Sequence, residues 1–249
     1  MRTLTIFTHI LLFTLASLSY TANATLILEW NSNSTSSNNP ATGASAKATL
    51  NFINDIDFAT NGLVVIQMLI RNTTDEITAF GAEATTSKLT GIAFDLVAPN
   101  QGLDQTNFTG GNFLTTMIIG ADAQPFGTLD FAAANDGDFN GGGTPNNALS
   151  EGVEDSLSVK VGFNGLSALQ VEAAFKVGFM DSSDSGLNYV ARFQQVNGGT
   201  NGNDASDKLD GGECCGDGGG GPPTEVPEPS VLFLLGSALL ALSLRKKVA

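Results

Sequence analysis

Apolar and polar residues alternate along much of the chain between residues 25 and 196. The clearest case is residues 156–163, where Leu157, Val159, Val161 and Phe163 share one face. This period of two predicts β-strands, and no long segment has the 3.6-residue period of a helix. Strands are predicted over residues 25–30, 48–53, 63–70, 89–97, 156–163, 171–179 and 189–196. Residues 63–70 form an almost continuous apolar run, which predicts a central strand buried on both faces.

Turn-forming residues separate these strands, because glycine, asparagine, serine and threonine are abundant and the chain contains 29 glycines. Short strands joined by many turns favour an all-β fold, an antiparallel β-sandwich. We predict this ectodomain over residues 25–210 and a Gly/Pro-rich linker over residues 211–225.

The N-terminus, residues 1–24, is typical of a secretory signal peptide that forms a signal helix. Arg2 supplies the positive charge, residues 6–18 are mostly apolar, and Ala22 and Ala24 supply the small residues of a cleavage site. The alternative is an uncleaved N-terminal membrane anchor. The pattern therefore predicts export and a role for signal peptidase.

The C-terminus, residues 226–249, contains 14 mostly apolar residues at 231–244, followed by Arg245, Lys246 and Lys247. A helix of that length rises about 21 Å, less than the roughly 30 Å of a hydrocarbon core. The basic cluster favours retention on the cytoplasmic side. We therefore predict a C-terminal transmembrane helix with the ectodomain outside and the basic stop inside.

Val226, Pro227, Glu228 and Pro229 precede this apolar segment. Together with the basic end, they resemble the PEP-CTERM sorting signal of Gram-negative bacteria. The resemblance implies recognition by an exosortase, cutting near Pro227–Pro229, and passage from an inner-membrane intermediate to the cell surface or the extracellular space. The alternative is a single-span anchor that is never cut.

Two internal segments, residues 140–146 with the acidic turn after them and residues 191–194 with 205–209, resemble parts of other proteins that carry this signal. Their ectodomains are cohesin-like, jelly-roll or carbohydrate-module-like sandwiches. The likeness implies an adhesive or matrix role beside exopolysaccharide. We also predict an ion pair between Arg192 and Asp207.

The formal net charge is -14, with 25 acidic residues against 11 basic ones, and such a surface repels nucleic acid. The single histidine, His9, lies in the predicted signal peptide. The exported form would then have no histidine for a catalytic triad or a zinc site. A glycan hydrolase would instead need paired carboxylates, for which Glu151, Glu154, Asp155 and Glu172 are candidates that nothing distinguishes.

Asp136, Asp138 and Asn140, followed by Gly141, match the first half of a calcium-binding loop. The position of the bidentate glutamate is taken by Asn147, so the motif is incomplete. The alternatives are a calcium site and a Gly/Asn-rich surface turn. We expect no other cofactor.

Cys214 and Cys215 are adjacent, and their Cα atoms lie closer than disulfides prefer. In an oxidising compartment each can instead form a cross-link to another chain.

These features favour a non-enzymatic, exosortase-sorted protein of the cell surface or extracellular matrix, associated with exopolysaccharide or biofilm. One alternative is an extracellular glycan hydrolase that uses carboxylates. The other is an ice- or surface-binding protein, which would need a flat, regular threonine array.

Overall fold

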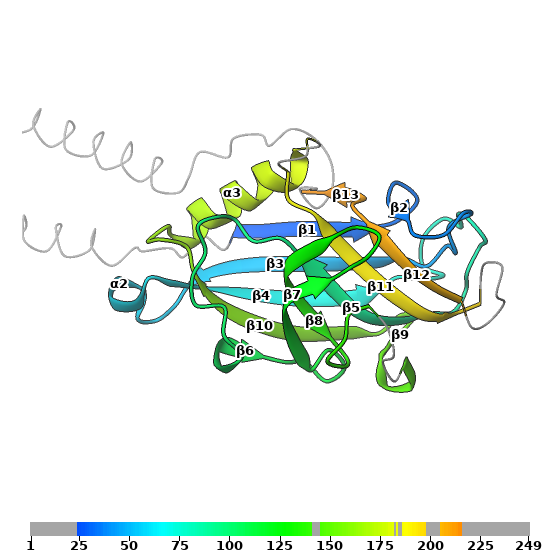
Figure 1. The fold of residues 1–249 in the computed structure, drawn as a ribbon, viewed down its shortest axis with the longest axis horizontal. Helices are drawn as coiled ribbons and strands as arrows, with labels where there is room; N and C mark the ends of the chain where they lie inside the picture. Colours follow the sequence, from blue (N-terminus) through cyan, green and yellow to red (C-terminus); the bar gives the residue numbers. More distant parts are fainter. Residues whose placement is uncertain (1–23, 141–144, 182, 184–185, 198–204, 216–249) are drawn as a thin grey trace, which may run out of the picture. The chain divides into compact units, whose positions relative to one another are not determined.

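Two antiparallel β-sheets and one long helix dominate the described part of the chain (Figure 1). The computed structural model describes residues 24–140, 145–181, 183, 186–197 and 205–215. The predicted signal helix before residue 24 and the predicted transmembrane helix in the tail lie outside these residues. Within them, no helix is long and apolar enough to cross a membrane.

The first sheet has six strands. In spatial order they are β13 (Glu213–Cys214), β1 (Ala24–Trp30), β3 (Ala46–Asn54), β4 (Leu63–Asn72), β10 (Glu154–Gly162) and β6 (Phe108–Thr109). Because β13 pairs with β1, the sheet includes residues that the sequence assigned to the linker.

The second sheet has seven strands. Its order is β2 (Thr35–Ser36), β12 (Ala205–Asp210), β11 (Tyr189–Val196), β5 (Lys88–Phe94), β8 (Thr128–Ala134) and β7 (Thr116–Asp122), and β9 (Leu149–Ser150) pairs with β5. The helical segments are α2 (Phe58–Asn61), α3 (Ala168–Met180), and the short 3₁₀ turns η1 (Gln105–Asn107) and η2 (Pro145–Asn147).

The main core lies between the two sheets, because alternate residues of each strand turn inward. The six-stranded sheet contributes side chains such as Leu50, Ile66 and Val159, and the seven-stranded sheet contributes Ile92 and Phe193. All of these residues are fully buried. The predicted antiparallel two-sheet architecture is confirmed.

Strand β4 lies at the centre of its sheet, as predicted, but it is buried on only one face. Gln67 and Leu69 point outward, and Leu69 is 42% exposed. The apolar run therefore does not reflect burial on both faces. It places apolar residues on a sheet face that no other element of the described residues covers.

The predicted strand over residues 171–179 is wrong, because these residues belong to α3. Ala168, Val171, Phe175 and Phe179 recur at helical spacing and are the buried residues of this helix. The Oε1 atom of Gln170 accepts a hydrogen bond from the backbone N–H of Ser167 at 2.9 Å, as in a capping box.

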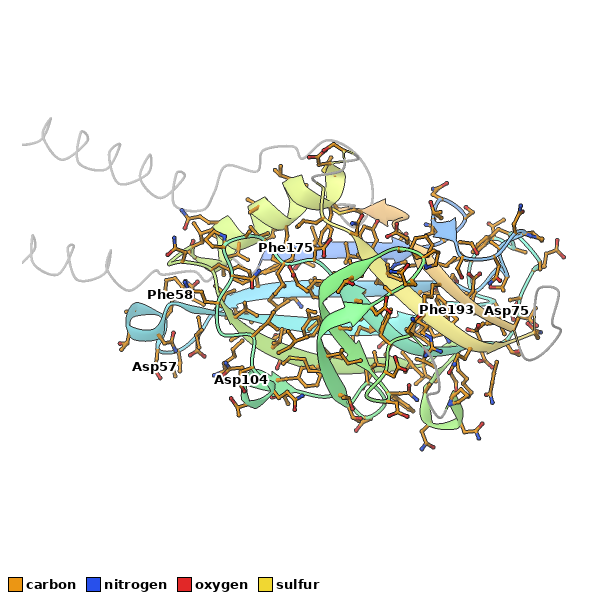
Figure 2. All side chains as sticks on the ribbon, in the orientation of Figure 1. Asp57, Phe58, Asp75, Asp104, Phe175 and Phe193 are labelled. Carbon is orange, nitrogen blue, oxygen red and sulfur yellow. A yellow bond between two sulfur atoms is a disulfide. The ribbon has the colours of Figure 1, made fainter. Side chains whose placement is uncertain are left out.

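Helix α3 packs against β1, β3 and β13, beside the six-stranded sheet (Figure 1). Phe175, labelled in Figure 2, is the centre of an aromatic cluster. Its ring centroid lies 5.3 Å from that of Phe52 in β3 and 6.3 Å from that of Phe94 in β5. The helix is thus fixed by contacts with both sheets.

Candidate functional site

The outer face of the six-stranded sheet carries a row of uncharged polar residues, one from each of five neighbouring strands. The pairing register aligns Thr25, Asn51, Gln67, Ser158 and Thr109 across β1, β3, β4, β10 and β6. We call these five residues the polar row. With strands roughly 4.8 Å apart, the row extends about 19 Å.

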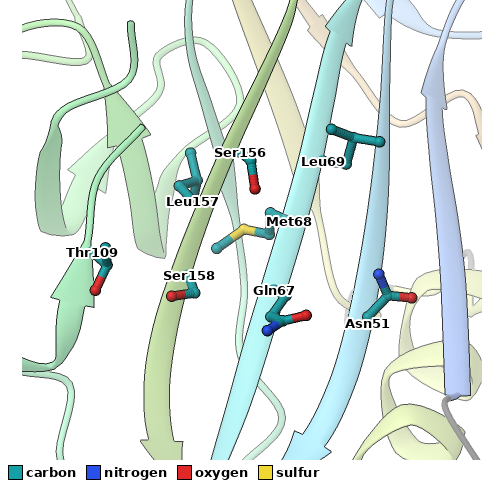
Figure 3. Close-up of a pocket in the computed structure, with 8 residues that line it drawn as sticks. All are labelled: Asn51, Gln67, Met68, Leu69, Thr109, Ser156, Leu157 and Ser158. Carbon is teal, nitrogen blue, oxygen red and sulfur yellow. The ribbon is translucent and has the colours of Figure 1, made fainter. Parts of the chain in front are cut away.

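A shallow hollow of about 260 Å³ lies along this row. Figure 3 shows the side chains of Asn51, Gln67, Ser158 and Thr109 at its surface, with Leu69 and Ser156 beside them. Thr25 Oγ1 donates a hydrogen bond to Asn51 Oδ1 at 2.8 Å, which leaves the amide nitrogen of Asn51 without a partner among the described residues. The side chains of Gln67 and Ser158 also have no partner in the described part of the chain.

Charged residues lie in a separate row at one side of the hollow, and they pair with one another. Lys47 Nζ lies 3.0 Å from Glu29 Oε1, and Arg71 bonds to Glu76 and Glu154. The hydrogen bond from Arg71 holds the pKa of Glu76 below its usual value. The charged side chains beside the hollow thus form ion pairs with one another, and the hollow itself presents hydroxyl and amide groups.

The four acidic residues that the sequence offered for hydrolysis have different structural roles. Asp155 is buried and accepts hydrogen bonds from the backbone N–H groups of Asn112, Phe113 and Leu114, at 2.8, 3.0 and 2.8 Å. Glu154 pairs with Arg71, and Glu151 Oε2 accepts from the backbone of Ser87. Glu172 lies on α3.

Sequence patterns missed a different pair of carboxyl groups, those of Asp95, directly after β5, and Asp210, at the end of β12. Burial raises the pKa of Asp210 to about 6, and the charge of Asp95 adds to the effect. Burial also raises the pKa of Asp95, whose Oδ2 atom accepts from the backbone of Asn188 at 2.9 Å. Asp210 Oδ1 is buried without a hydrogen-bond partner among the described residues. Sequence spacing gave no signal for this pair, because the two residues are far apart in the chain.

The half calcium motif lies in the loop after β8. Its oxygen atoms accept hydrogen bonds from protein groups: Asp138 Oδ1 from the backbone of Asn140 at 2.7 Å, and Asn140 Oδ1 from Lys208 Nζ. Asp136 Oδ1 accepts from the backbone of Gly137 at 2.6 Å. Gly141 lies outside the described residues. Within those residues, no group of three His, Cys, Asp or Glu side chains could hold a metal ion.

The predicted ion pair between Arg192 and Asp207 is wrong. In the β11–β12 pairing, Arg192 lies opposite Lys208, and Asp207 lies opposite Phe193, so the two side chains point to opposite faces. Asp207 instead accepts hydrogen bonds from Ser36, Ser37 and Thr42.

Cys214 and Cys215 form a disulfide with one another, so the structure offers no free thiol for the predicted cross-link. The pair is packed against the domain. The backbone N–H of Cys215 donates to Ile27 O at 2.8 Å, and Cys215 Sγ lies 3.7 Å from the carbonyl oxygen of Lys176 in α3.

Residues of the predicted processing sites lie mostly outside the described part of the chain. Ala22 precedes it, and Ala24 is the first residue of β1. The predicted sorting residues Val226, Pro227, Glu228 and Pro229, and the basic stop Arg245, Lys246 and Lys247, follow it.

Comparison with known proteins identifies the tail. Residues 225–247 match the family model of the PEP-CTERM protein-sorting motif, which covers the predicted sorting residues and the basic stop. No curated protein and no solved structure matches the chain. The motif implies an exported protein that is held as a membrane-anchored intermediate, processed by an exosortase and sorted to the cell surface.

Proposed function

We propose that this chain is a non-enzymatic protein of the cell surface or extracellular matrix, and that the polar row binds a neutral stretch of extracellular polysaccharide. The observation that carries the proposal is the alignment of hydroxyl and amide groups on an uncovered sheet face. Such groups donate and accept hydrogen bonds, which suits ligands rich in hydroxyl groups. Leu69, exposed beside the row, offers apolar contact to a sugar ring.

The sorting tail supports this proposal, because it brings the ectodomain to the surface where such polymers are found. As part of the same proposal, the ectodomain is a cohesin-like or carbohydrate-module-like β-sandwich. An ice-binding role fits the row less well, since only its two end residues, Thr25 and Thr109, are threonines.

Binding to a glycan array and to insoluble polysaccharides tests the proposal. We expect the double variant Asn51→Ala/Gln67→Ala to lose about tenfold or more in affinity, because it removes amide groups from the centre of the row. The control is Thr128→Ala/Ser206→Ala, which alters exposed polar residues of the other sheet. Equal binding by both variants would contradict the proposed site.

A carboxylate-dependent hydrolase is the second candidate, and the raised pKa of Asp210 is the observation that favours it. This candidate requires polysaccharide cleavage near pH 5–6 that is abolished by Asp210→Asn or Asp95→Asn. Release of reducing ends measures it. We expect no release, because the row, and not the carboxyl pair, lies along the hollow.

A further inference from the structure

Helix α3 has two apolar stripes, and only one of them is buried. The buried stripe contains Phe175 and Phe179, which pack into the core. The second contains Leu169, Ala173, Val177 and Met180, spaced by four, four and three residues, so it lies along one side of the helix. We call these four residues the exposed stripe.

The exposed stripe is open to solvent along its length. Leu169 is 52% exposed, Val177 71% and Met180 64%, and Ala173 is also exposed. The other large exposed apolar side chains of the described residues, such as Ile119 and Ile77, come from separate elements. A row of apolar residues on one helix is a contact surface more often than scattered single residues are.

The stripe cannot turn into the core, because α3 is held in place. The backbone N–H of Ala168 donates to Asn54 Oδ1 at 2.7 Å at the first turn, and Phe175 is packed between the two sheets. Whatever covers the stripe must therefore come from outside the domain.

The chain leaves the described domain beside this same helix. Cys215, the last described residue, lies against the carbonyl oxygen of Lys176 and is tied there through the disulfide and the pairing of β13 with β1. The apolar segment of the sorting tail begins at residue 231, sixteen residues later (231 − 215 = 16). Sixteen residues reach at most about 55 Å. In the anchored intermediate, the tail thus keeps α3 within about that distance of the bilayer.

We propose that the exposed stripe of α3 rests on the lipid surface while the sorting tail is anchored. The contact is apolar, as in helices that lie at a membrane interface, and anionic lipid should not strengthen it, because the chain carries a net charge of -14. A small apolar contact of this kind persists only while the anchored tail keeps the domain at a high local concentration beside the lipid. Cutting at the sorting motif therefore releases the domain from the lipid as well as from its anchor.

Tryptophan fluorescence of the full chain in phosphatidylcholine vesicles tests this proposal. The chain contains one tryptophan, Trp30, which is fully buried and gives a constant background. New probes are placed by Leu169→Trp and Val177→Trp on the stripe. Ile119→Trp on β7 is a matched control, because Ile119 and Leu169 are equally exposed, each at 52%.

We expect acyl-chain-brominated phosphatidylcholine to quench both stripe probes about twofold more than the control, with little change when phosphatidylglycerol is added. Equal quenching of the three probes would overturn the proposal. Two further results would also overturn it. A blue shift of the stripe probes that depends on protein concentration in the absence of lipid would indicate that a second copy of the chain covers the stripe. A blue shift that needs no lipid and is lost on truncation after residue 224 would indicate that the tail covers it.

Discussion

The outer faces of the two sheets differ in what covers them. On the six-stranded sheet, the polar row and the charged pairs meet solvent directly. On the seven-stranded sheet, a second core covers the face, built from Phe139 in the loop after β8, Val190 in β11 and small side chains such as Ala93 and Ala132. The uncovered face is accessible from solvent without rearrangement, whereas the covered face contributes stability.

On the covered face, the ring of Phe139 packs against Gly91. A Cβ atom added at Gly91 would lie 2.9 Å from Phe139 Cε2, so glycine leaves the space that the ring fills. The contrast between the faces can therefore be tested by removing side chains from each.

The largest effect is expected for Phe139→Ala. Phe139 is 2% exposed, and its removal should lower the free energy of unfolding by about 3–5 kcal/mol. Leu69→Ala, on the uncovered face, should change it by less than about 0.5 kcal/mol. Urea denaturation of both variants measures the difference. Similar losses would show that the two faces do not differ in this way.

A second, smaller effect concerns Asp210, which shares the outer face of the seven-stranded sheet with Val190, its partner in the pairing. Folding raises the pKa of Asp210 from 3.8 to about 6. Between these two pH values, the carboxyl group is largely protonated in the folded state and largely ionised in the unfolded state. The contribution of this group to stability therefore falls as the pH rises from about 4 to 6, and the full penalty remains above pH 6.

We expect Asp210→Asn to raise the free energy of unfolding at pH 7 by about 2–3 kcal/mol and to have little effect at pH 4. Asp95 is the charged neighbour that adds to the shift, and Asp95→Asn should raise stability at pH 7 by a smaller amount. Thermal unfolding between pH 4 and 8 measures both variants. A stability gain that is the same at every pH would point to packing and not to ionisation.

Sequence patterns predicted the strands of the uncovered face better than those of the covered one. Strands β3, β4 and β10 combine alternation with β-branched or bulky side chains. By contrast, β8 contains a run of alanines and β12 has charged residues at three of its six positions, so neither has a strong strand signal. Tertiary packing creates these strands.

The polar row itself could not be predicted from the sequence. Alternation placed Ser156 and Ser158 outward, but aligning Thr25, Gln67 and Thr109 requires the pairing register of strands far apart in the chain. The error over residues 171–179 has a local cause. Alternation and helical spacing coincide there, and Ser167 with Gln170 was the capping signal that separated them.

The smallest effect is expected for calcium, at the loop that carries Phe139 over the covered face. A calcium site would use the oxygens of Asp136, Asp138 and Asn140, whereas a structural turn would use Asn140 to hold Lys208. We expect the second, because Asn140 Oδ1 already accepts from Lys208 Nζ and Asn140 Nδ2 donates to Asp122 Oδ2 at 3.1 Å.

Millimolar calcium should accordingly leave the Tm unchanged, while Lys208→Met should lower the free energy of unfolding by about 1 kcal/mol, because it removes the hydrogen bonds that Lys208 Nζ donates to Gln124 O and Asn140 Oδ1. Thermal unfolding with calcium or with a chelator makes the measurement, with Asp138→Asn as the control. A rise in Tm that Asp138→Asn abolishes would establish the calcium site and would make the covering loop a second ligand-binding part of the molecule.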